Sequence, residues 1–319
     1  MQQQLQFEWY DIERDAPGWD ETVNAVGQNV FHRSAVLATE QWGRAIRRGV
    51  VVKRFGARLC VLGGLVTPLG MGGRFRALSF PPSAERAPAD LPERLTEWLL
   101  YQGVTDIRIG SLDGGVEAYA STARPCRSSE RLEFIYDLSL SEEQRLRTAS
   151  TNHRRKLRKS ESEPMVLRRI EHHQAWTMMR LRATWGKRRG ERLNWRWLWR
   201  NYRYYRRLTT HLGEDRSARL YGLFSESGGI LSMAYMLERD GASFYMIGAS
   251  SEEGYKRGAS VRLFFELARH YPGAGIRTMN FGGVPVEARE ERHEENGVYR
   301  FKTGFGIEPT LRRSLTIEV

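Results

Sequence analysis

The sequence predicts a mixed α/β protein built as two successive halves. Short runs of β-branched and apolar residues alternate with amphipathic stretches along the chain. The same order of elements occurs in each half, and 319 residues suffice for two domains of ordinary size. The predicted cut lies in the helix that connects the halves, giving an N-terminal domain of residues 1–155 and a C-terminal domain of residues 156–319.

Apolar periodicity and turn residues define the elements of the first half. Pro92 opens a helix and Gly103 follows it as a C-cap. Two short apolar runs joined by a turn indicate a hairpin. The elements predicted in order are helices over residues 19–26 and 34–48, strands over 50–55 and 59–65, a helix over 92–102, strands over 104–109 and 132–138, and a helix over 141–159.

The second half repeats this alternation. Three consecutive strands separated by turns with glycine or aspartate indicate an antiparallel meander, and an amphipathic helix then ends before Pro272. The elements predicted in order are a strand over 165–170, a helical region reaching residue 212, strands over 219–225, 230–239 and 242–249, a helix over 260–271, a strand over 278–281, and a strand pair after residue 299.

The composition excludes several classes of protein. Hydrophobic residues make up 40% and charged residues 28% of the chain, which allows a buried core. No apolar run reaches the roughly 18 to 20 residues of a membrane span, and the first residues lack the basic flank and apolar stretch of a secretory signal. The two cysteines, Cys60 and Cys126, are too few for a disulfide framework, and a single disulfide between them is the alternative to two free thiols. We therefore expect a cytoplasmic globular protein rather than a collagen, a coiled coil, a secreted mini-protein or a membrane protein.

Positive charge is concentrated in about a quarter of the chain. Residues 141–215 carry 20 Lys and Arg against 8 Asp and Glu, an excess that equals the net charge of +12 of the whole chain. Because salt screens charges beyond about 8 Å, a concentrated patch acts on a partner where scattered charges do not. A solvated face is the alternative, but the pattern favours a polyanionic partner, either RNA or a phosphorylated substrate.

Two segments carry this charge. The first, residues 153–159, is a compact basic run with one apolar residue, and the second, residues 187–207, interleaves cations with aromatic residues. In the second segment a row of arginines shares one helix face, which we expect to contact phosphate. We expect the neighbouring aromatic stripe to pack on the core, with base stacking as the alternative. The arginines are Arg192, Arg196, Arg200 and Arg203, and the stripe is Trp195, Trp199 and Tyr202.

Several catalytic motifs are missing from the sequence, among them the P-loop, the Rossmann fingerprint, the nucleophile elbow and C-x-x-C. His172 and His173 are adjacent, so they point to different sides of a helix and do not chelate a metal together. His293 lies among glutamates, a pattern typical of a solvated loop. The sequence therefore lacks the motifs required of a kinase, a serine hydrolase, a Rossmann-type dehydrogenase or a zinc enzyme.

The most informative segment lies near the C-terminus. Gly282 and Gly283 end a strand where the backbone turns sharply or approaches another group closely. After an acidic loop, Lys302 lies between aromatic residues and glycines. An ammonium in that setting suits a developing oxyanion, a carboxylate or a phosphate, with an ordinary surface lysine as the alternative.

This segment resembles the closing signature of the Fem (FemABX) aminoacyltransferases, which are relatives of the GNAT acyltransferases. The matching residues are Asn280-Phe281-Gly282-Gly283 and Gly297-x-Tyr299-x-Phe301-Lys302-x-Gly304-Phe305-Gly306. Three further stretches resemble the family in the same order: Phe31 to Ser34 ahead of Trp42, Asn152 to Lys159, and Tyr245 to Ser251. Together they cover almost the whole chain.

The resemblance implies two GNAT-like domains in tandem, with the acceptor bound in or beside the first and a tRNA-linked donor approaching the second. The implied activity joins an amino acid from aminoacyl-tRNA to the amine of a peptide acceptor, either a peptidoglycan precursor or a peptide natural product. No metal or organic cofactor is implied. The enzyme has to position a neutral amine beside the ester and stabilise the oxyanion.

The resemblance also implies roles for individual residues. Lys302 stabilises the transition state, and Tyr245 and Arg192 contact the acceptor. Where the family has an N-terminal phosphate-binding lysine, Arg44 or Arg47 has to serve. The motif residues around the lysine are Gly282, Gly283, Phe301 and Gly304, and the implied tRNA-binding residues are Arg154, Arg155, Lys156, Arg158 and Lys159.

Two other functions stay open. An acetyl-CoA-dependent N-acyltransferase on the same fold prefers (R/Q)-x-x-G-x-(G/A) at a helix start to bind the pyrophosphate, and Tyr255 to Ser260 departs from this pattern at its first and last positions. A non-catalytic RNA-binding protein is the other alternative, and the intact pair Phe301 and Lys302 argues against it.

Overall fold

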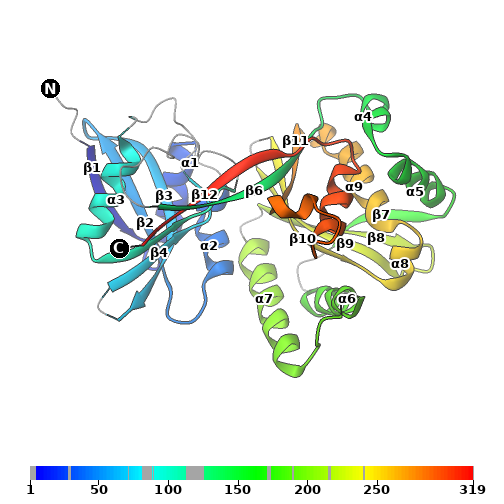
Figure 1. The fold of residues 1–319 in the computed structure, drawn as a ribbon, viewed down its shortest axis with the longest axis horizontal. Coiled ribbons are helices and arrows are strands. Elements are labelled where there is room, and N and C mark those ends of the chain that lie inside the picture. Colours follow the sequence, from blue (N-terminus) through cyan, green and yellow to red (C-terminus); the bar gives the residue numbers. More distant parts are fainter. Residues whose placement is uncertain are drawn as a thin grey trace. The chain divides into compact units, whose positions relative to one another are not determined.

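The chain divides into two compact units in the computed structural model (Figure 1). The structure describes residues 5–27, 30–70, 72–80, 88, 90–112, 126–170, 174–188, 190–214, 217–239 and 241–318. The first unit comprises Met1–Arg131 together with Leu311–Val319, and the second comprises Leu132–Thr310. The chain therefore passes between the units twice, and each unit is described below by itself.

The first unit is built on a mixed sheet with the strand order β1-β2-β3-β4-β5-β12. β4 and β5 pair in parallel, whereas β1–β2, β2–β3, β3–β4 and β5–β12 pair antiparallel. Its strands are β1 (Leu5–Asp11), β2 (Ile46–Arg54), β3 (Ala57–Leu69), β4 (Gly72–Ala77), β5 (Val104–Ile109) and β12 (Thr310–Glu318), and its helices are α1 (Ala16–Ala25), α2 (Ser34–Glu40) and α3 (Leu91–Tyr101).

Trp19 of α1 closes the core of this unit against β2. It is fully buried, and its indole Nε1 donates a hydrogen bond of 2.7 Å to the carbonyl of His32. A β-carbon on Gly49 would lie 2.2 Å from the indole ring, so only glycine lets the strand pass this close. His32 is also fully buried, and its Nδ1 accepts a hydrogen bond of 3.1 Å from the Gly63 amide.

The second unit holds the strand order β6-β11-β10-β9-β8-β7. β10 and β11 pair in parallel, whereas β7–β8, β8–β9 and β9–β10 pair antiparallel. The strands are β6 (Cys126–Asp137), β7 (Met165–Ile170), β8 (Ala218–Ser225), β9 (Ile230–Arg239), β10 (Ala242–Ser250) and β11 (Thr278–Pro285).

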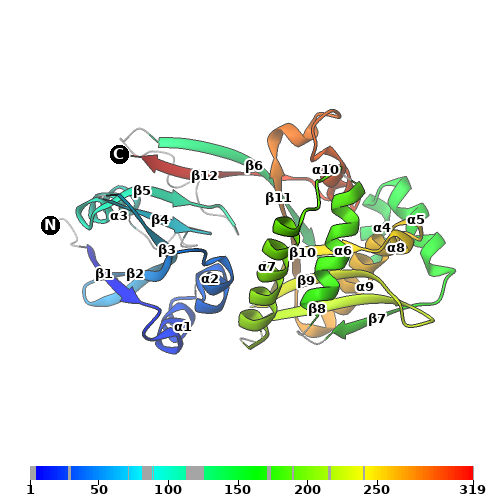
Figure 2. The ribbon, with the colours of Figure 1, turned by 90° about the horizontal axis from the view of Figure 1, so that it is seen from below.

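Helices cover both faces of this sheet. Helices α6 and α7 lie on one face, and α9 lies on the other (Figures 1 and 2). The apolar side of α9 supplies Leu263, Phe264 and Leu267 to a core shared with β9 and β11. The helices are α4 (Glu142–Thr148), α5 (Thr151–Glu161), α6 (Ala175–Arg188), α7 (Trp195–Glu214), α8 (Glu252–Lys256), α9 (Ala259–His270) and α10 (Asn296–Thr303).

The mixed α/β class is confirmed, as are the meander of β8, β9 and β10, helix α9 and strand β11. The connecting helix is interrupted, because Ala149 and Ser150 are extended and Ser150 caps α5 by accepting a hydrogen bond from the His153 amide. The cut expected between residues 155 and 156 falls inside α5, whereas the division lies within β6. Local patterns do not reveal that the C-terminal strand returns to the first unit.

Two predicted elements are wrong. The helix expected over residues 34–48 ends at Glu40, because Gln41 is already extended with φ −74° and ψ 118°. Gly43 then turns the chain with a positive φ of 61° before it enters β2. The strand pair expected after residue 299 is a helix, α10, followed by a single strand, β12. Buried Asn296 anchors the start of α10 by donating a hydrogen bond of 3.0 Å to the Ala288 carbonyl.

Candidate active site

Strands β10 and β11 part in the middle of the second unit. Their pairing runs from Ala242 opposite Thr278 to Phe244 opposite Asn280, although both strands continue beyond these residues. A β-bulge also shifts the register of β10 against β9 between Tyr245 and Ile247. Because bulges and unpaired strand ends leave backbone groups available to other partners, this region can receive a ligand.

The Lys302 ammonium lies beside this point. It is 5% exposed, and its Nζ donates a hydrogen bond of 3.1 Å to the Gly283 carbonyl and lies 5.4 Å from the centre of the Phe134 ring. Gly282 has a φ of 71°, which favours glycine, and its amide donates a hydrogen bond of 2.7 Å to the Asn280 side chain. The sequence-based expectation of a defined lysine between aromatic residues and glycines therefore fits the observed geometry.

Tyr245 lies on the other side of the gap. A β-carbon on Gly282 would lie 3.8 Å from the Tyr245 carbonyl oxygen and 4.0 Å from Lys302 Nζ, so these groups converge. The Tyr245 ring packs edge-on against Phe264, with ring centroids 5.0 Å apart. Burial raises the pKa of the Tyr245 hydroxyl, so this hydroxyl is neutral at physiological pH.

Arg182 of α6 was not singled out in the sequence. Its guanidinium lies 3.8 Å from the centre of the Trp185 ring, and its Nη2 lies 3.3 Å from a Glu191 oxygen. It is near enough to Tyr245 and Tyr205 to lower the pKa of both, against the larger effect of burial. The spacing of three residues between Arg182 and Trp185 along a helix was the available signal.

The closing motif packs against the start of the basic helix α5. A β-carbon on Gly304 would lie 2.2 Å from the His153 ring, and the Ser150 amide donates a hydrogen bond of 2.9 Å to the Gly304 carbonyl. The His153 ring also packs edge-on against Phe305, with centroids 4.7 Å apart. Gly304 is thus the position where α5 and α10 touch, and Phe301 lies half-buried beside it.

His153 is a buried base and not part of a cationic surface. It is 3% exposed, and neither ring nitrogen has a hydrogen-bond partner among the described residues. Burial, and secondarily the nearby charge of Lys156, lowers the pKa of His153 to about 4. The imidazole is therefore neutral at physiological pH.

The five cations expected to bind tRNA extend from this junction along α5. Arg155, Arg158 and Lys159 are exposed, and Arg154 and Lys156 are half-buried. The Lys156 stem packs on Gly258 at the start of α9, and Lys156 Nζ lies 5.9 Å from the centre of the Tyr255 ring. Arg188 of α6 lies over the same ring at 3.3 Å, so cations from two helices gather around Tyr255.

The aromatic stripe of α7 does not pack as expected. Trp195 is 70% and Trp199 is 56% exposed, whereas Tyr205, Leu208 and Leu212 form the buried side of the helix. Tyr202 is half-buried and contacts Trp199. The expectation that the tryptophans dock on the core is wrong, because the residues further along α7 make the contact with the core instead.

The three arginines implied to bind the acceptor come from other segments of the chain than Lys302. Arg192 is exposed in the turn between α6 and α7. Arg44 and Arg47 belong to the first unit, where Arg44 is exposed in a turn. Arg47 forms an ion pair of 2.7 Å with Glu13, and this guanidinium lowers the pKa of the Glu13 carboxyl to about 2. The Arg47 guanidinium is thus already engaged by a carboxylate.

Known proteins resemble this chain in sequence pattern and in fold. Residues 146–303 match the family described as an acetyltransferase (GNAT) domain. The chain is similar to the solved structure of FemX, with a TM-score of 0.73 and 15% identity over 98% of this chain and 97% of that chain. A search of curated proteins found no match.

Two further solved structures are similar along most of their length. One is L-PGS from Bacillus licheniformis, with a TM-score of 0.58 and 14% identity over 95% of this chain and 90% of that chain. The other is a tandem GNAT protein from the clavulanic acid biosynthesis pathway, with a TM-score of 0.53 and 14% identity over 99% of this chain and 98% of that chain.

The family match and the structural likeness agree on the fold. Residues 146–303 match a GNAT acetyltransferase domain, and the chain as a whole has a tandem GNAT-like fold similar to that of FemX. The resemblance to the Fem proteins drawn from the sequence is therefore confirmed at the level of the fold. None of the helices in the described part of the chain is long and apolar enough to cross a membrane.

Proposed function

We propose that this protein is an aminoacyl-tRNA-dependent aminoacyltransferase, which transfers an amino acid from tRNA to the amine of a peptide acceptor. The observation that carries this proposal is the buried Lys302 ammonium, held 3.1 Å from the Gly283 carbonyl where β10 and β11 part. The likeness to FemX along nearly the whole chain adds support. The acceptor is a peptidoglycan precursor or a peptide natural product, and no resident metal or organic cofactor is required.

The proposed chemistry is ester-to-amide exchange. A neutral amine of the acceptor attacks the ester carbonyl of the aminoacyl-tRNA, and a tetrahedral oxyanion forms. The Lys302 ammonium stabilises this oxyanion because the ammonium is almost fully excluded from solvent and is already held in position. Collapse of the intermediate breaks the ester bond, and the proton lost by the amine goes to the departing ribose oxygen. Tyr245 lines the acceptor side in this scheme.

Helix α5 is proposed to hold the tRNA through its phosphates. Its exposed cations lie on a helix that is joined to α10 through His153 and Gly304, so a strand bound there approaches the helix that carries Lys302. The exposed tryptophans of α7 add further contacts, because exposed rings can stack on unpaired bases near the acceptor end. Such binding depends strongly on salt and little on sequence.

Acetyl-CoA-dependent acyl transfer is the second candidate function, because the family match is to an acetyltransferase domain. A pyrophosphate at the start of α9 needs open backbone amides. In this chain the Arg257 amide donates to the Glu253 carbonyl at 3.0 Å, and the Gly258 amide donates to the Tyr255 carbonyl at 3.2 Å. Lys156 also lies against Gly258, so the amides of Arg257 and Gly258 are not available to a pyrophosphate, which weighs against this second candidate.

Transfer assays separate the two functions. Purified protein is incubated with a radiolabelled amino acid on tRNA and a set of peptide amines, with and without RNase. We expect amide product that RNase abolishes. Product made from acetyl-CoA in the presence of RNase supports the second candidate, and no transfer from any charged tRNA contradicts the proposal.

A Lys302→Gln variant tests the role of the ammonium. Removal of one donor to an oxyanion commonly costs about 100- to 1,000-fold in turnover, so a loss of this size is expected, with tRNA affinity nearly unchanged. Arg300→Gln is the matched control, since Arg300 is exposed on the same helix. Normal turnover of the Lys302 variant rules out the assigned role.

Charge reversal tests the proposed tRNA surface. The double variant Arg155→Glu and Lys156→Glu should bind tRNA more weakly, and the slope of log affinity against log salt should fall by about 2. The double variant Arg289→Glu and Arg292→Glu changes the same number of charges at exposed positions outside α5 and serves as the control. Equal effects of both pairs would argue against a specific role of α5.

A further inference from the structure

Exposed aromatic side chains gather on α6 and α7, the two helices on one face of the second sheet (Figure 2). Trp176 of α6 is 58% exposed, and Trp195 and Trp199 of α7 are 70% and 56% exposed. Single apolar residues at a surface are ordinary, whereas several large ones side by side mark a binding surface. These two helices therefore present rings that the packing of the core does not use.

The rings form one row across both helices. Tyr202 of α7 joins them, because the centroid of its ring lies 6.0 Å from that of Trp176 and 6.1 Å from that of Trp199. Trp195 precedes Trp199 by four positions, so it lies on the same face of α7, about 6 Å away along the helix axis. These four residues are called the aromatic row below.

Arginines run beside the aromatic row. Arg196, Arg200 and Arg203 each follow a ring of the row by one position, which places them about 100° further round the helix. All three side chains are exposed, and none forms an ion pair with a carboxylate in the described part of the chain. Residues 175–188 and 195–212 contain no Asp or Glu. The row is thus flanked by positive charge that no neighbouring acid on these helices offsets.

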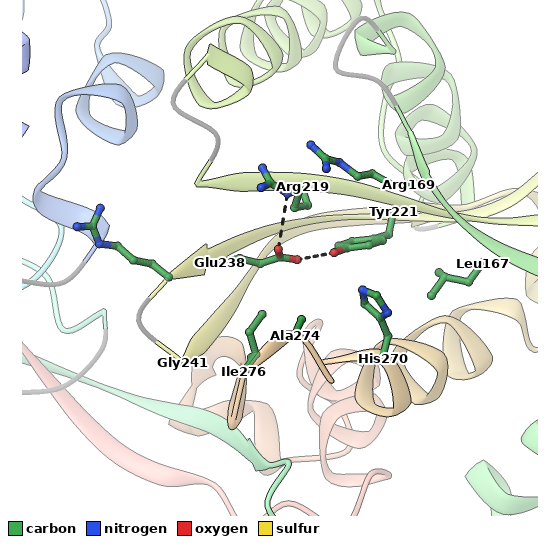
Figure 3. Close-up of a pocket in the computed structure, with 10 residues that line it drawn as sticks. Leu167, Arg169, Arg219, Tyr221, Glu238, Gly241, His270, Ala274 and Ile276 are labelled. Carbon is green, nitrogen blue, oxygen red and sulfur yellow. Dashed lines mark hydrogen bonds and ion pairs between the residues drawn. The ribbon is translucent and has the colours of Figure 1, made fainter. Parts of the chain in front are cut away.

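Two other arginines near aromatic rings are paired with carboxylates. Arg182 Nη2 lies 3.3 Å from a Glu191 oxygen. At the cavity beside the end of α9, Glu238 accepts a hydrogen bond of 2.7 Å from the Tyr221 hydroxyl and lies 3.8 Å from Arg219 Nε (Figure 3). The arginines beside the aromatic row differ from these two, because they remain available to an anionic partner.

We propose, resting on the tRNA-dependent function above, that the aromatic row binds the unpaired 3′ end of the tRNA and makes an unpaired end a requirement for tight binding. In a single strand the bases can project to one side and the phosphates to the other, which matches a row of rings beside a row of arginines. A duplex hides the faces of its bases. Helix α5 therefore contacts the phosphates of the paired stem, and the four rings stack on about four unpaired bases.

The aromatic row lies on helices that border the candidate active site. Helix α6 packs against β10, and Arg182 of this helix is near enough to Tyr245 to lower its pKa, against the larger effect of burial. Trp176 and Arg182 are six residues apart on α6, about 9 Å along its axis. An RNA end held on the row is therefore a short distance from the gap between β10 and β11.

Fluorescence anisotropy with RNA hairpins that carry no amino acid tests this assignment without any transfer reaction. The hairpins share one stem and have unpaired 3′ tails of zero, two or four nucleotides. We expect the four-nucleotide tail to tighten binding at least 10-fold over the blunt hairpin, because each stacked base contributes about 5-fold or more in affinity. A blunt hairpin that binds as tightly as the tailed ones, or phosphatidylglycerol vesicles that bind more tightly than any hairpin, overturns the proposal.

Two exposed rings give a matched pair of variants. Trp199→Ala removes a ring of the row, and Tyr101→Ala removes a ring of the first unit that is 87% exposed. We expect Trp199→Ala to weaken binding of the four-nucleotide tail by at least about 5-fold and to leave the blunt hairpin unchanged, whereas Tyr101→Ala should match the unaltered protein for both. Equal weakening for blunt and tailed hairpins, or no weakening for either, refutes stacking on the row.

These binding results are independent of the transfer reaction. Because the hairpins carry no amino acid, a protein that transfers normally but ignores the tail contradicts the role of the aromatic row alone. A protein that prefers the tail but transfers nothing contradicts the proposed activity and leaves the RNA-binding surface in place.

Discussion

Replacement of Gly304 by alanine should destabilise the second unit through one contact. The backbone at Gly304 has φ −59° and ψ −20°, which alanine adopts freely. The new methyl group, however, would lie 2.2 Å from the His153 ring, whereas ordinary contacts begin near 3.4 Å. The ring cannot easily retreat because Phe301 and Phe305 flank it, with centroids 5.6 and 4.7 Å away. Overpacking of this kind costs about 1–3 kcal/mol.

Urea titrations at pH 7.5 would measure this loss as a change in the free energy of unfolding. Gly297→Ala is the control, since Gly297 lies in the same helix and a β-carbon there meets nothing within 4 Å. That variant should be neutral or gain up to about 1 kcal/mol. In the double variant His153→Ala and Gly304→Ala, the methyl group enters the space left by the ring. The double loss should therefore be about 1–3 kcal/mol smaller than the sum of the single losses, and simple additivity would refute the reasoning.

Three further predictions concern buried groups. Burial lowers the pKa of His32 and of His153 from 6.5 to about 4, so their stabilising neutral forms are fully populated above pH 6.5, and stability should fall as the pH drops toward 4. Each pKa unit corresponds to about 1.4 kcal/mol, so below pH 4 the loss in the free energy of unfolding approaches about 3 kcal/mol for each histidine. A free energy of unfolding in urea that stays constant between pH 7 and 4.5 would contradict this prediction. Gly282→Ala forces alanine to a φ of 71°, at a cost of about 1–2 kcal/mol, and should also slow transfer. Burial raises the pKa of the Cys60 thiol to about 12, so in a Cys126→Ser protein iodoacetamide should label it only after urea is added.

The sequence predicted best what depends on neighbouring residues. The meander of β8 to β10, helix α9 and the concentration of cations on α5 follow from apolar periodicity, turn residues and composition, all of which are local. The restricted setting of Lys302 was also visible, because aromatic residues and glycines flank it in the chain. Its contact with Phe134 was not, since that residue lies on β6, far away in the sequence.

Where two local interpretations were equally good, the wrong one was sometimes chosen. Helix α7 offers two apolar stripes, and the sheet buries Tyr205, Leu208 and Leu212 while Trp195 and Trp199 stay exposed. No pattern within the helix distinguishes these outcomes, because both stripes have helical spacing. The same holds for His153, which stands in a basic run and yet is buried.

Element types, the cationic segment and the restricted setting of Lys302 could thus be inferred from residues that are close together in the chain. Three features needed the folded molecule: the parting of β10 from β11, the contact of His153 with Gly304, and the return of β12 to the first unit. Each arises from contacts between strands or helices whose relative position is set by packing of the whole core. Such contacts leave no periodic trace in the sequence, and for this reason the folded structure was required to find them.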